Sequence, residues 1–203
     1  MGRLIELLMN QVFLYLKLSL YFWGLVLIGG LVFGLGPASA TILSAIAEHG
    51  SDHASIRWKD LWQSYKESFI SSNLVTLFLA SWFLLLLYGL FLLVQAPASF
   101  LGVSVTLING LFLVLPLTLY LHWLQLQTTY SFSFLTGLKL SFIASFLSIT
   151  RNLRLFLGLI LLGLLSRWIP AFGFFLAAGL SLRFIHDCLK PDLTWLAEDV
   201  QHD

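Results

Sequence analysis

The stretch from Leu74 to Val94 reads LVTLFLASWFLLLLYGLFLLV and contains no charged residue. An α-helix rises about 1.5 Å per residue, so about 20 apolar residues cross the roughly 30 Å hydrocarbon core of a bilayer. Inside lipid, a spanning segment must satisfy its own backbone hydrogen bonds, and a helix does so within one segment. This stretch therefore predicts a transmembrane helix.

The composition of the whole chain also favours a membrane protein. Of its 203 residues, 59% are apolar and 10% are charged, whereas soluble domains have about 45–50% and about 25%. These values exclude an ordinary soluble domain, a disordered chain and a nucleic-acid-binding protein with a basic surface. The net charge is +1, and the single cysteine excludes a disulfide scaffold.

Four more apolar stretches are assigned as spans: residues 18–35, 102–124, 153–166 and 169–185. We predict an all-α fold, a polytopic transmembrane helical bundle of about five spans. Residues 1–203 are expected to form a single integral membrane domain. A cytoplasmic loop over residues 37–73 and a polar tail over residues 186–203, without a core of its own, complete it.

The segment from Phe134 to Thr150 is ambiguous. One of its faces carries large apolar side chains and another carries small ones, and Lys139 argues against central burial in a membrane. The small residues are Gly137, Ser141, Ala144, Ser145 and Ser148. Small residues let helices approach closely in lipid. We interpret this segment as a tilted or interfacial helix that leads into the fourth span.

A helix break is predicted at Gly36-Pro37. Glycine permits unusual backbone angles, and proline fits the first turn of a new helix. We expect that helix to run from Ala38 to His49 and to end at Gly50. Gly30 and Gly34 form a GxxxG pair that would let a second backbone approach the first span.

An amphipathic helix is predicted from Ile56 to Ser72. Trp58, Trp62, Tyr65 and Phe69 recur at helical spacing and share one face, and Asp60, Ser64, Glu67 and Ser71 share the opposite face. Aromatic side chains on one side and polar ones on the other are typical of a helix in the headgroup region. We expect this helix to lie along the cytoplasmic membrane surface, separate from the span that follows.

Lysine and arginine predict the orientation, because cytoplasmic loops carry an excess of them. With five spans, the cations on one side are Arg57, Lys59, Lys66, Lys139, Arg151, Arg154, Arg183 and Lys190. The other side holds only Arg3, Lys17 and Arg167. This excess predicts a cytoplasmic C-terminus and an external N-terminus.

Few residues offer catalytic chemistry. No ionisable residue lies near the middle of a predicted span, where ion-coupled transporters usually keep one. No motif of the known catalytic or nucleotide-binding kinds occurs. His122 and His186 are expected to be interfacial or solvated and not to ligate a metal. We therefore expect no enzyme activity, no cofactor and no metal.

Two stretches form a more specific pattern: FGLGPASA at residues 33–40, and WKDLWQSYKESF at residues 58–69, with Ser72-Asn73 after it. The pattern resembles the YesL family of small bacterial membrane proteins. These carry a G-x-G-P-A-[TS]-A turn and an F-W-x-x-Y-K-x-x-F…S-N stretch. Leu61 stands where an aromatic residue often precedes the tryptophan. The likeness extends to length and span order, but only residues 33–73 match at the level of motifs.

The resemblance implies a multi-pass protein of the bacterial plasma membrane without an established activity. Family members are often encoded near carbohydrate-uptake genes, which implies an accessory or scaffold component linked to carbohydrate uptake or utilisation. The expected partners are the lipid bilayer and a membrane transport complex or a second copy, not nucleic acid. The alternative is a transporter or channel component with its own substrate path. In that case Asn109 and Thr106 would face inward, with Tyr88 or Tyr120.

The motif itself has two interpretations. It either seats the loop on lipid or forms a docking platform for a partner at the membrane surface. The residues concerned are Gly34, Gly36, Pro37, Trp58, Trp62, Tyr65, Lys66, Phe69 and Asn73.

Overall fold

The computed structural model describes residues 2–50, 52, 54–95, 99–130 and 132–200, and of residues 2–5, 7, 8 and 191–200 only the backbone. All regular structure in these ranges is helical. The elements are α1 (Gly2–Ile28), α2 (Val32–His49), α3 (Trp58–Gln95), α4 (Phe100–Gln127), α5 (Phe134–Leu147), α6 (Ile149–Trp168), α7 (Pro170–Phe172), the π-helical segment η1 (Gly173–Ala177) and α8 (Ala178–Val200). The predicted all-α fold is confirmed.

Five described segments are long and apolar enough to cross a membrane, which is the predicted number. They are Met9–Ile28, Trp58–Gln95, Phe100–Gln127, Ile149–Trp168 and Pro170–Lys190. The first of them lies earlier than the predicted residues 18–35, because α1 ends at Ile28. α5 has 14 residues and therefore a length of only about 21 Å, which is less than the hydrocarbon core. Its Gly137, Ser141 and Ala144 are buried, so the small-residue face packs inside the protein.

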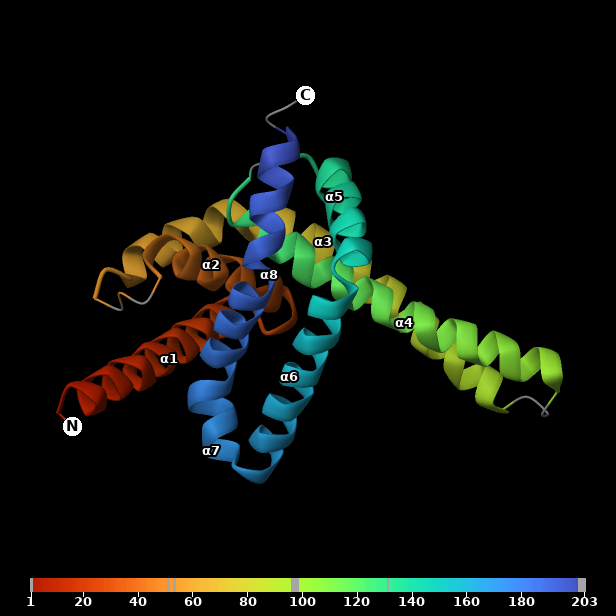
Figure 1. The fold of residues 1–203 in the computed structure, drawn as a ribbon, viewed down its shortest axis with the longest axis horizontal. Helices are drawn as coiled ribbons and strands as arrows, with labels where there is room; N and C mark the ends of the chain where they lie inside the picture. Colours follow the sequence, from red (N-terminus) through yellow and green to blue (C-terminus); the bar gives the residue numbers. More distant parts are fainter. Residues whose placement is uncertain (1, 51, 53, 96–98, 131, 201–203) are drawn as a thin grey trace.

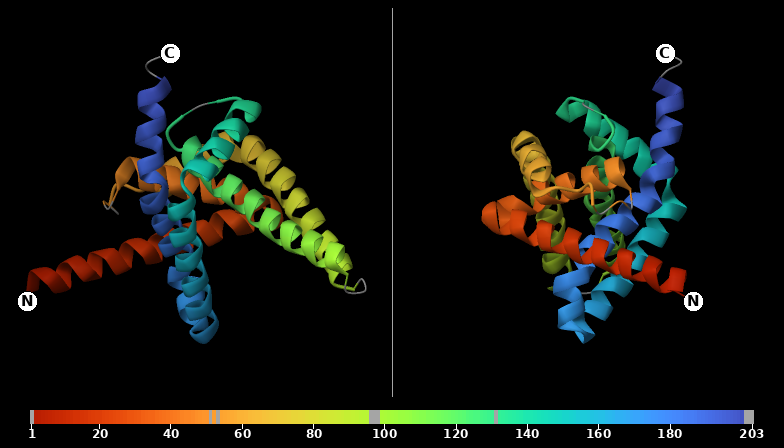
Figure 2. Two further views of the ribbon diagram at one scale, coloured as in Figure 1. Left: turned by 45° about the vertical axis from the view of Figure 1, so that its right-hand side comes forward. Right: turned by 90° about the vertical axis from the view of Figure 1, so that its left-hand side faces the viewer.

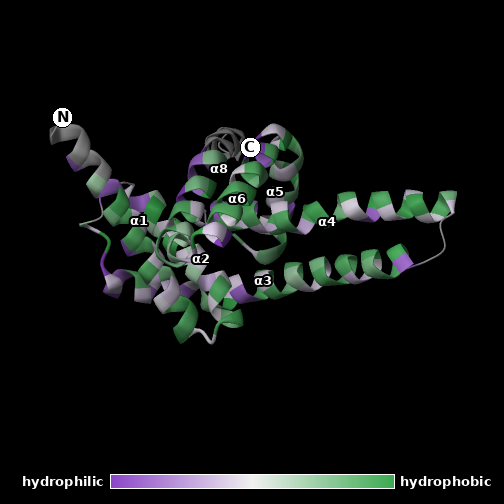
Figure 3. Cartoon of the chain, turned by 90° about the horizontal axis from the view of Figure 1, so that it is seen from below, coloured by the Kyte–Doolittle hydropathy of each residue, from purple (hydrophilic) through white to green (hydrophobic). Residues whose placement is uncertain are grey.

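Three arms diverge from a common centre (Figures 1 and 2). The N-terminal part of α1 forms one arm, the C-terminal part of α3 with the N-terminal part of α4 forms the second, and α6 with α7 and the beginning of α8 forms the third. α8 then continues through the centre to the opposite side. The buried core lies where the arms meet. Its largest side chains include Leu14, Leu18, Leu25, Ile42, Leu43, Ile46, Leu119, Leu124, Leu155 and Leu189. Along the α3–α4 arm the exposed surface is mostly apolar, as lipid contact requires (Figure 3).

The predicted break at Gly36-Pro37 is wrong, because the chain turns earlier, between Ile28 and Val32. Gly30 has φ 75°, the Leu31 N–H donates to the Val26 carbonyl at 2.9 Å, and the Gly30 N–H donates to the Leu27 carbonyl at 3.1 Å. This is the Schellman ending of a helix, which needs a left-handed residue. Pro37 instead lies inside α2.

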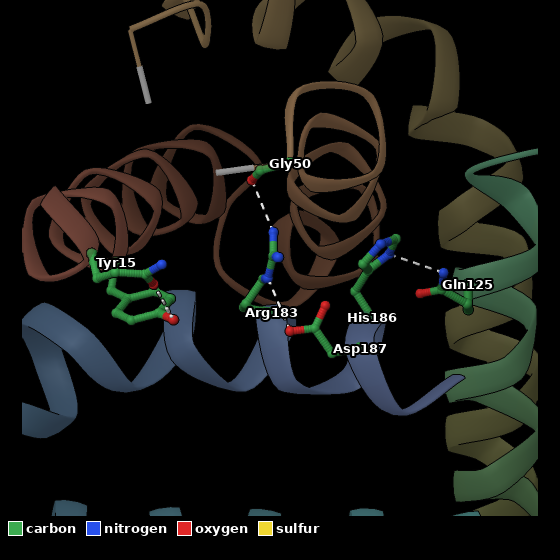
Figure 4. Close-up of polar contacts among 7 residues, drawn as sticks. Tyr15, Gly50, Gln125, Arg183, His186 and Asp187 are labelled. Carbon is green, nitrogen blue, oxygen red and sulfur yellow. Dashed lines mark hydrogen bonds and ion pairs between the residues drawn. The ribbon is translucent and has the colours of Figure 1, made fainter. Parts of the chain in front are cut away.

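The α2 helix does end where the sequence predicts. Gly50 has φ 61°, and its N–H donates to the Ile46 carbonyl at 2.9 Å. Arg183 of α8 then supplies a partner from outside, because its Nη1 donates to the Gly50 carbonyl oxygen at 2.9 Å. The Arg183 Nε also pairs with Asp187 Oδ2 at 3.0 Å (Figure 4).

We predicted that the amphipathic stretch and the second span are separate helices, and this is wrong, because they form one continuous helix. α3 has 38 residues and therefore extends about 57 Å, nearly twice the hydrocarbon core. Neither glycine nor proline interrupts the junction near Ser72. Asn73, which could have capped a new helix, donates from Nδ2 to the Phe69 carbonyl at 3.0 Å, one turn back in the same helix.

The C-terminal region also differs from the predicted polar tail. α8 continues to Val200, and Leu189 is fully buried in the core. The π-helical segment before α8 changes the register of the backbone hydrogen bonds. In the first turn of α8, the Gly179 N–H donates to Ser19 Oγ of α1 at 2.8 Å, and this bond connects α8 to α1.

Candidate functional site

Gly34, Gly36 and Pro37 lie inside the protein, so they cannot form a docking surface. A Cβ at Gly34 would collide with the Val26 backbone, and one at Gly36 would collide with the Thr76 side chain. Gly30 lies in the turn with φ 75°, so the predicted GxxxG pair does not share one helix face. These glycines allow α1, α2 and α3 to pack closely.

Thr76 lies at this contact. Its Oγ1 donates to the Ser72 carbonyl at 2.7 Å within α3. Ser39 of α2 likewise donates to its own helix, to the Leu35 carbonyl at 2.8 Å. The close approach at Gly36 therefore lies beside a hydroxyl group whose hydrogen is already donated within α3.

We expected the aromatic stripe of α3 to face the headgroup region of the membrane. In the structure, much of the stripe packs on other parts of the protein. Tyr65 is only 3% exposed, and its hydroxyl lies against Gly29 in the α1–α2 turn. The Trp58 ring lies against α1, with its centroid 5.5 Å from that of Tyr21. Trp62 and Phe69 flank Tyr65 at centroid distances of 5.7 and 5.6 Å. The stripe mainly fixes the α1–α2 turn against α3.

Two motif residues stand apart from this packing. Lys66 is exposed, and its Nζ lies 5.7 Å from the centroid of the Trp62 ring. Asn73 is 8% exposed, and its Oδ1 is buried without a hydrogen-bond partner. Of the motif, Lys66 and the partly exposed Trp58, Trp62 and Phe69 remain accessible from outside.

A buried polar network lies where α4, α5, α6 and α8 meet. His122 Nε2 lies 3.0 Å from Asn152 Oδ1, while Asn152 Nδ2 donates to the Ser145 carbonyl at 2.8 Å. Because an amide oxygen only accepts, His122 is the donor of its pair. Gln125 Nε2 lies 3.0 Å from His186 Nδ1, which accepts (Figure 4). The expectation that both histidines are interfacial or solvated is wrong, since they are 2% and 6% exposed.

Sequence reasoning missed the partners in this network. Asn152 and Gln125 have no distinguishing local pattern, because their partners His122 and His186 are 30 and 61 residues away in the sequence. The only available signal was that four polar residues cluster near the ends of apolar segments. Such residues are costly in a membrane unless they are paired. Their pairing depends on which helices pack together.

An open cleft of about 600 Å³ adjoins this network between α4 and α6. We call it the α4–α6 cleft. Its walls are mostly apolar and include Leu111, Phe156 and Leu153, and Asn152, Ser145 and Thr118 are its only polar lining residues among those described. It can therefore accept an apolar surface and offer a few polar contacts at one end.

The residues expected to line a substrate path lie elsewhere. Asn109 donates from Nδ2 to the Leu86 carbonyl at 3.1 Å, across the α3–α4 pair. Thr106 Oγ1 donates to the Gly102 carbonyl of its own helix at 2.8 Å. The Asn109 bond joins α4 to α3, whereas the Thr106 bond stays within α4. Among the described residues, no group of three or more histidine, cysteine, aspartate and glutamate side chains could hold a metal.

Comparison with known proteins adds one relationship. Residues 15–90 match a family described as "Protein of unknown function, DUF624". The matched range covers the second half of α1, all of α2 and most of α3, and therefore includes the α1–α2 turn and the aromatic stripe. No curated protein and no solved structure shows significant similarity to the chain.

Proposed function

We propose that this protein is an accessory or scaffold subunit of a membrane assembly, and that it holds a transmembrane helix of its partner in the α4–α6 cleft. The observation that carries the proposal is the cleft itself, which lies open between two arms whose helices are long and apolar enough to span. Transmembrane helices associate through close packing and a few polar contacts. Thr118, Ser145 and Asn152 offer such contacts.

The resemblance to the YesL family supports a more specific role. It suggests a partner in carbohydrate import in the bacterial plasma membrane. The excess of lysine and arginine on one side separately favours a cytoplasmic C-terminus. The alternative, in which the protein forms its own substrate path, has less support, because Asn109 donates to the backbone of α3 and Thr106 donates to the backbone of its own helix. We therefore favour an auxiliary role without turnover of its own.

Photo-crosslinking in native membranes tests this role. A photoreactive amino acid at Leu153, which is 71% exposed in the cleft, should yield a crosslink to one integral membrane protein, identified by mass spectrometry. The matched control is Leu85, which is 70% exposed on α3 outside the cleft. The same substitution at Leu85 should not give that product.

A second variant checks the geometry. Leu111→Trp fills the cleft and should reduce the yield of the crosslink from residue 153 at least about tenfold, whereas Leu85→Trp should leave it unchanged. Both variants should melt at the temperature of the unmodified protein, because both side chains are exposed. Crosslinks only to lipid, or equal crosslinking at residues 153 and 85, would contradict the proposal.

A further inference from the structure

A second hollow of about 510 Å³ lies between α2, the first half of α3 and the C-terminal end of α4. We call it the hydroxyl groove. Unlike the α4–α6 cleft, its lining is mainly polar. Its aliphatic hydroxyl groups belong to Ser44, Ser64, Ser68, Ser71, Thr128 and Thr129. Its volume lies within the roughly 300–1,000 Å³ that is usual for small-molecule sites.

Most of these hydroxyls can offer lone pairs and not hydrogen atoms to a ligand. Four of them already donate to main-chain carbonyls close in sequence. The bonds run from Ser44 to Ala40 (3.0 Å), Ser68 to Ser64 (2.9 Å), Ser71 to Ser68 (3.2 Å) and Thr128 to Gln125 (2.7 Å). A hydroxyl has one hydrogen and two lone pairs, so the acceptor sites remain. The groove is therefore rich in acceptors.

Among the described residues that line the groove, the single charged side chain is an acidic one, Glu67, which disfavours anionic ligands. Its carboxylate accepts from Gln63 Nε2 at 3.1 Å and keeps further lone pairs. A phosphate or carboxylate ligand would meet acceptors and a negative charge without a cation to balance it. A ligand with many hydrogen-bond donors fits instead.

Tyr130 and Phe132, both half-buried, form an aromatic wall on one side of the groove. Trp123 is only 3% exposed and packs edge-on against Phe132, with centroids 6.3 Å apart, so it supports this wall and does not offer a face to a ligand. Aromatic rings offer a flat apolar surface beside polar groups, which suits a ligand with both C–H and O–H faces. Gln127 supplies an amide, which already bonds Ser71 and Ser72 at 3.4 Å.

We infer that the hydroxyl groove binds a neutral polyhydroxylated molecule of the size of a mono- or disaccharide. Such a molecule supplies donors to the hydroxyl and carboxylate oxygens and places an apolar ring face on the aromatic wall. It needs no cation in the site. The groove carries this inference by itself. A role for such binding in sugar uptake would rest, in addition, on the accessory function proposed above.

Calorimetry on the purified full-length chain in lipid nanodiscs tests the inference. The probes are glucose, galactose, xylose, maltose, spermidine and inorganic phosphate. At least one of the four sugars should bind saturably with a stoichiometry of one, and phosphate should not bind. Spermidine binding without sugar binding would overturn the inference, because it would assign the groove to cations. Absence of saturable binding by all four sugars would overturn it as well.

Variants assign the binding to the groove. Glu67→Gln combined with Ser68→Ala should weaken sugar binding at least about tenfold. The matched control is Ser104→Ala, because Ser104 also donates to its own helix, to the Phe100 carbonyl at 2.9 Å, and lies outside the groove. Equal affinities in the two variants would contradict the assignment. Because Glu67 is exposed, a folded variant is expected, and its melting temperature verifies this.

The outcome is independent of the partner experiment. Sugar binding uses the isolated chain and residues of α3, whereas partner crosslinking uses residue 153 of α6 in native membranes. Either result can therefore fail while the other stands.

Discussion

Substitution of Gly36 by alanine should destabilise the fold, although alanine is the better helix former. A Cβ at this position would collide with Thr76 Oγ1 and lie 3.1 Å from the Ser72 carbonyl oxygen of α3. Neither neighbour can retreat easily. Ser72 O is part of the α3 backbone, and Thr76 Oγ1 donates to that same oxygen. The added methyl group must therefore push α2 away from α3.

The magnitude follows from two opposing effects. Insertion of a methylene-sized group into a packed interior costs about 1–3 kcal/mol. Replacement of glycine by alanine within a helix returns roughly 0.5–1 kcal/mol. The midpoints of the two ranges leave a net loss of about 1 kcal/mol. For a chain of this size, that loss corresponds to a melting temperature lower by about 2–4 °C.

Thermal unfolding in detergent, followed by circular dichroism, measures this loss. Gly110→Ala is the matched control, because Gly110 also lies within a helix and an added Cβ there meets no atom within 4 Å. It should leave the melting temperature unchanged or raise it. In Gly36→Ala combined with Thr76→Ala, part of the loss should be recovered, because the colliding Oγ1 is gone.

Equal shifts for Gly36→Ala and Gly110→Ala would refute this reasoning. Close packing would then not explain the glycine at position 36. A normal melting temperature together with loss of partner crosslinking would also refute it, and would restore the docking interpretation of the motif.

Two more predictions concern burial. Asn152→Leu should lower the free energy of unfolding by about 1–3 kcal/mol, because the buried His122 donor loses its bond to Asn152. The control Asn109→Leu should lower it by only about 0.6 kcal/mol, as is usual for one interhelical bond in a membrane. Similar losses for the two variants in chemical denaturation would contradict a special role of the network. In a Cys188→Ser background, a maleimide should label Glu67→Cys rapidly and Tyr65→Cys very slowly, since Glu67 is exposed and Tyr65 is 3% exposed. Equal labelling rates would show that the aromatic stripe lies on the protein surface.

The amino-acid sequence determined the helical class and the existence of five long apolar segments. Both follow from local composition, because a segment in lipid must satisfy its backbone internally and must be long enough to cross. The end of α2 at Gly50 and the small-residue face of α5 were also local patterns. They could be recognised because a left-handed glycine ends a helix and small side chains allow close contact.

Only the tertiary structure decided which breaks and which polar groups matter. The chain turns at Gly29-Gly30 and not at the predicted Gly36-Pro37, where Gly36 packs against Thr76 of α3. From the sequence alone, the aromatic stripe is compatible with a membrane surface as well as with a protein core. The structure shows that the α1–α2 turn covers Tyr65. The pairing of His122 with Asn152 and the hydroxyl groove each join residues from helices far apart in the sequence. Such contacts depend on how helices pack against one another, and no local periodicity records that.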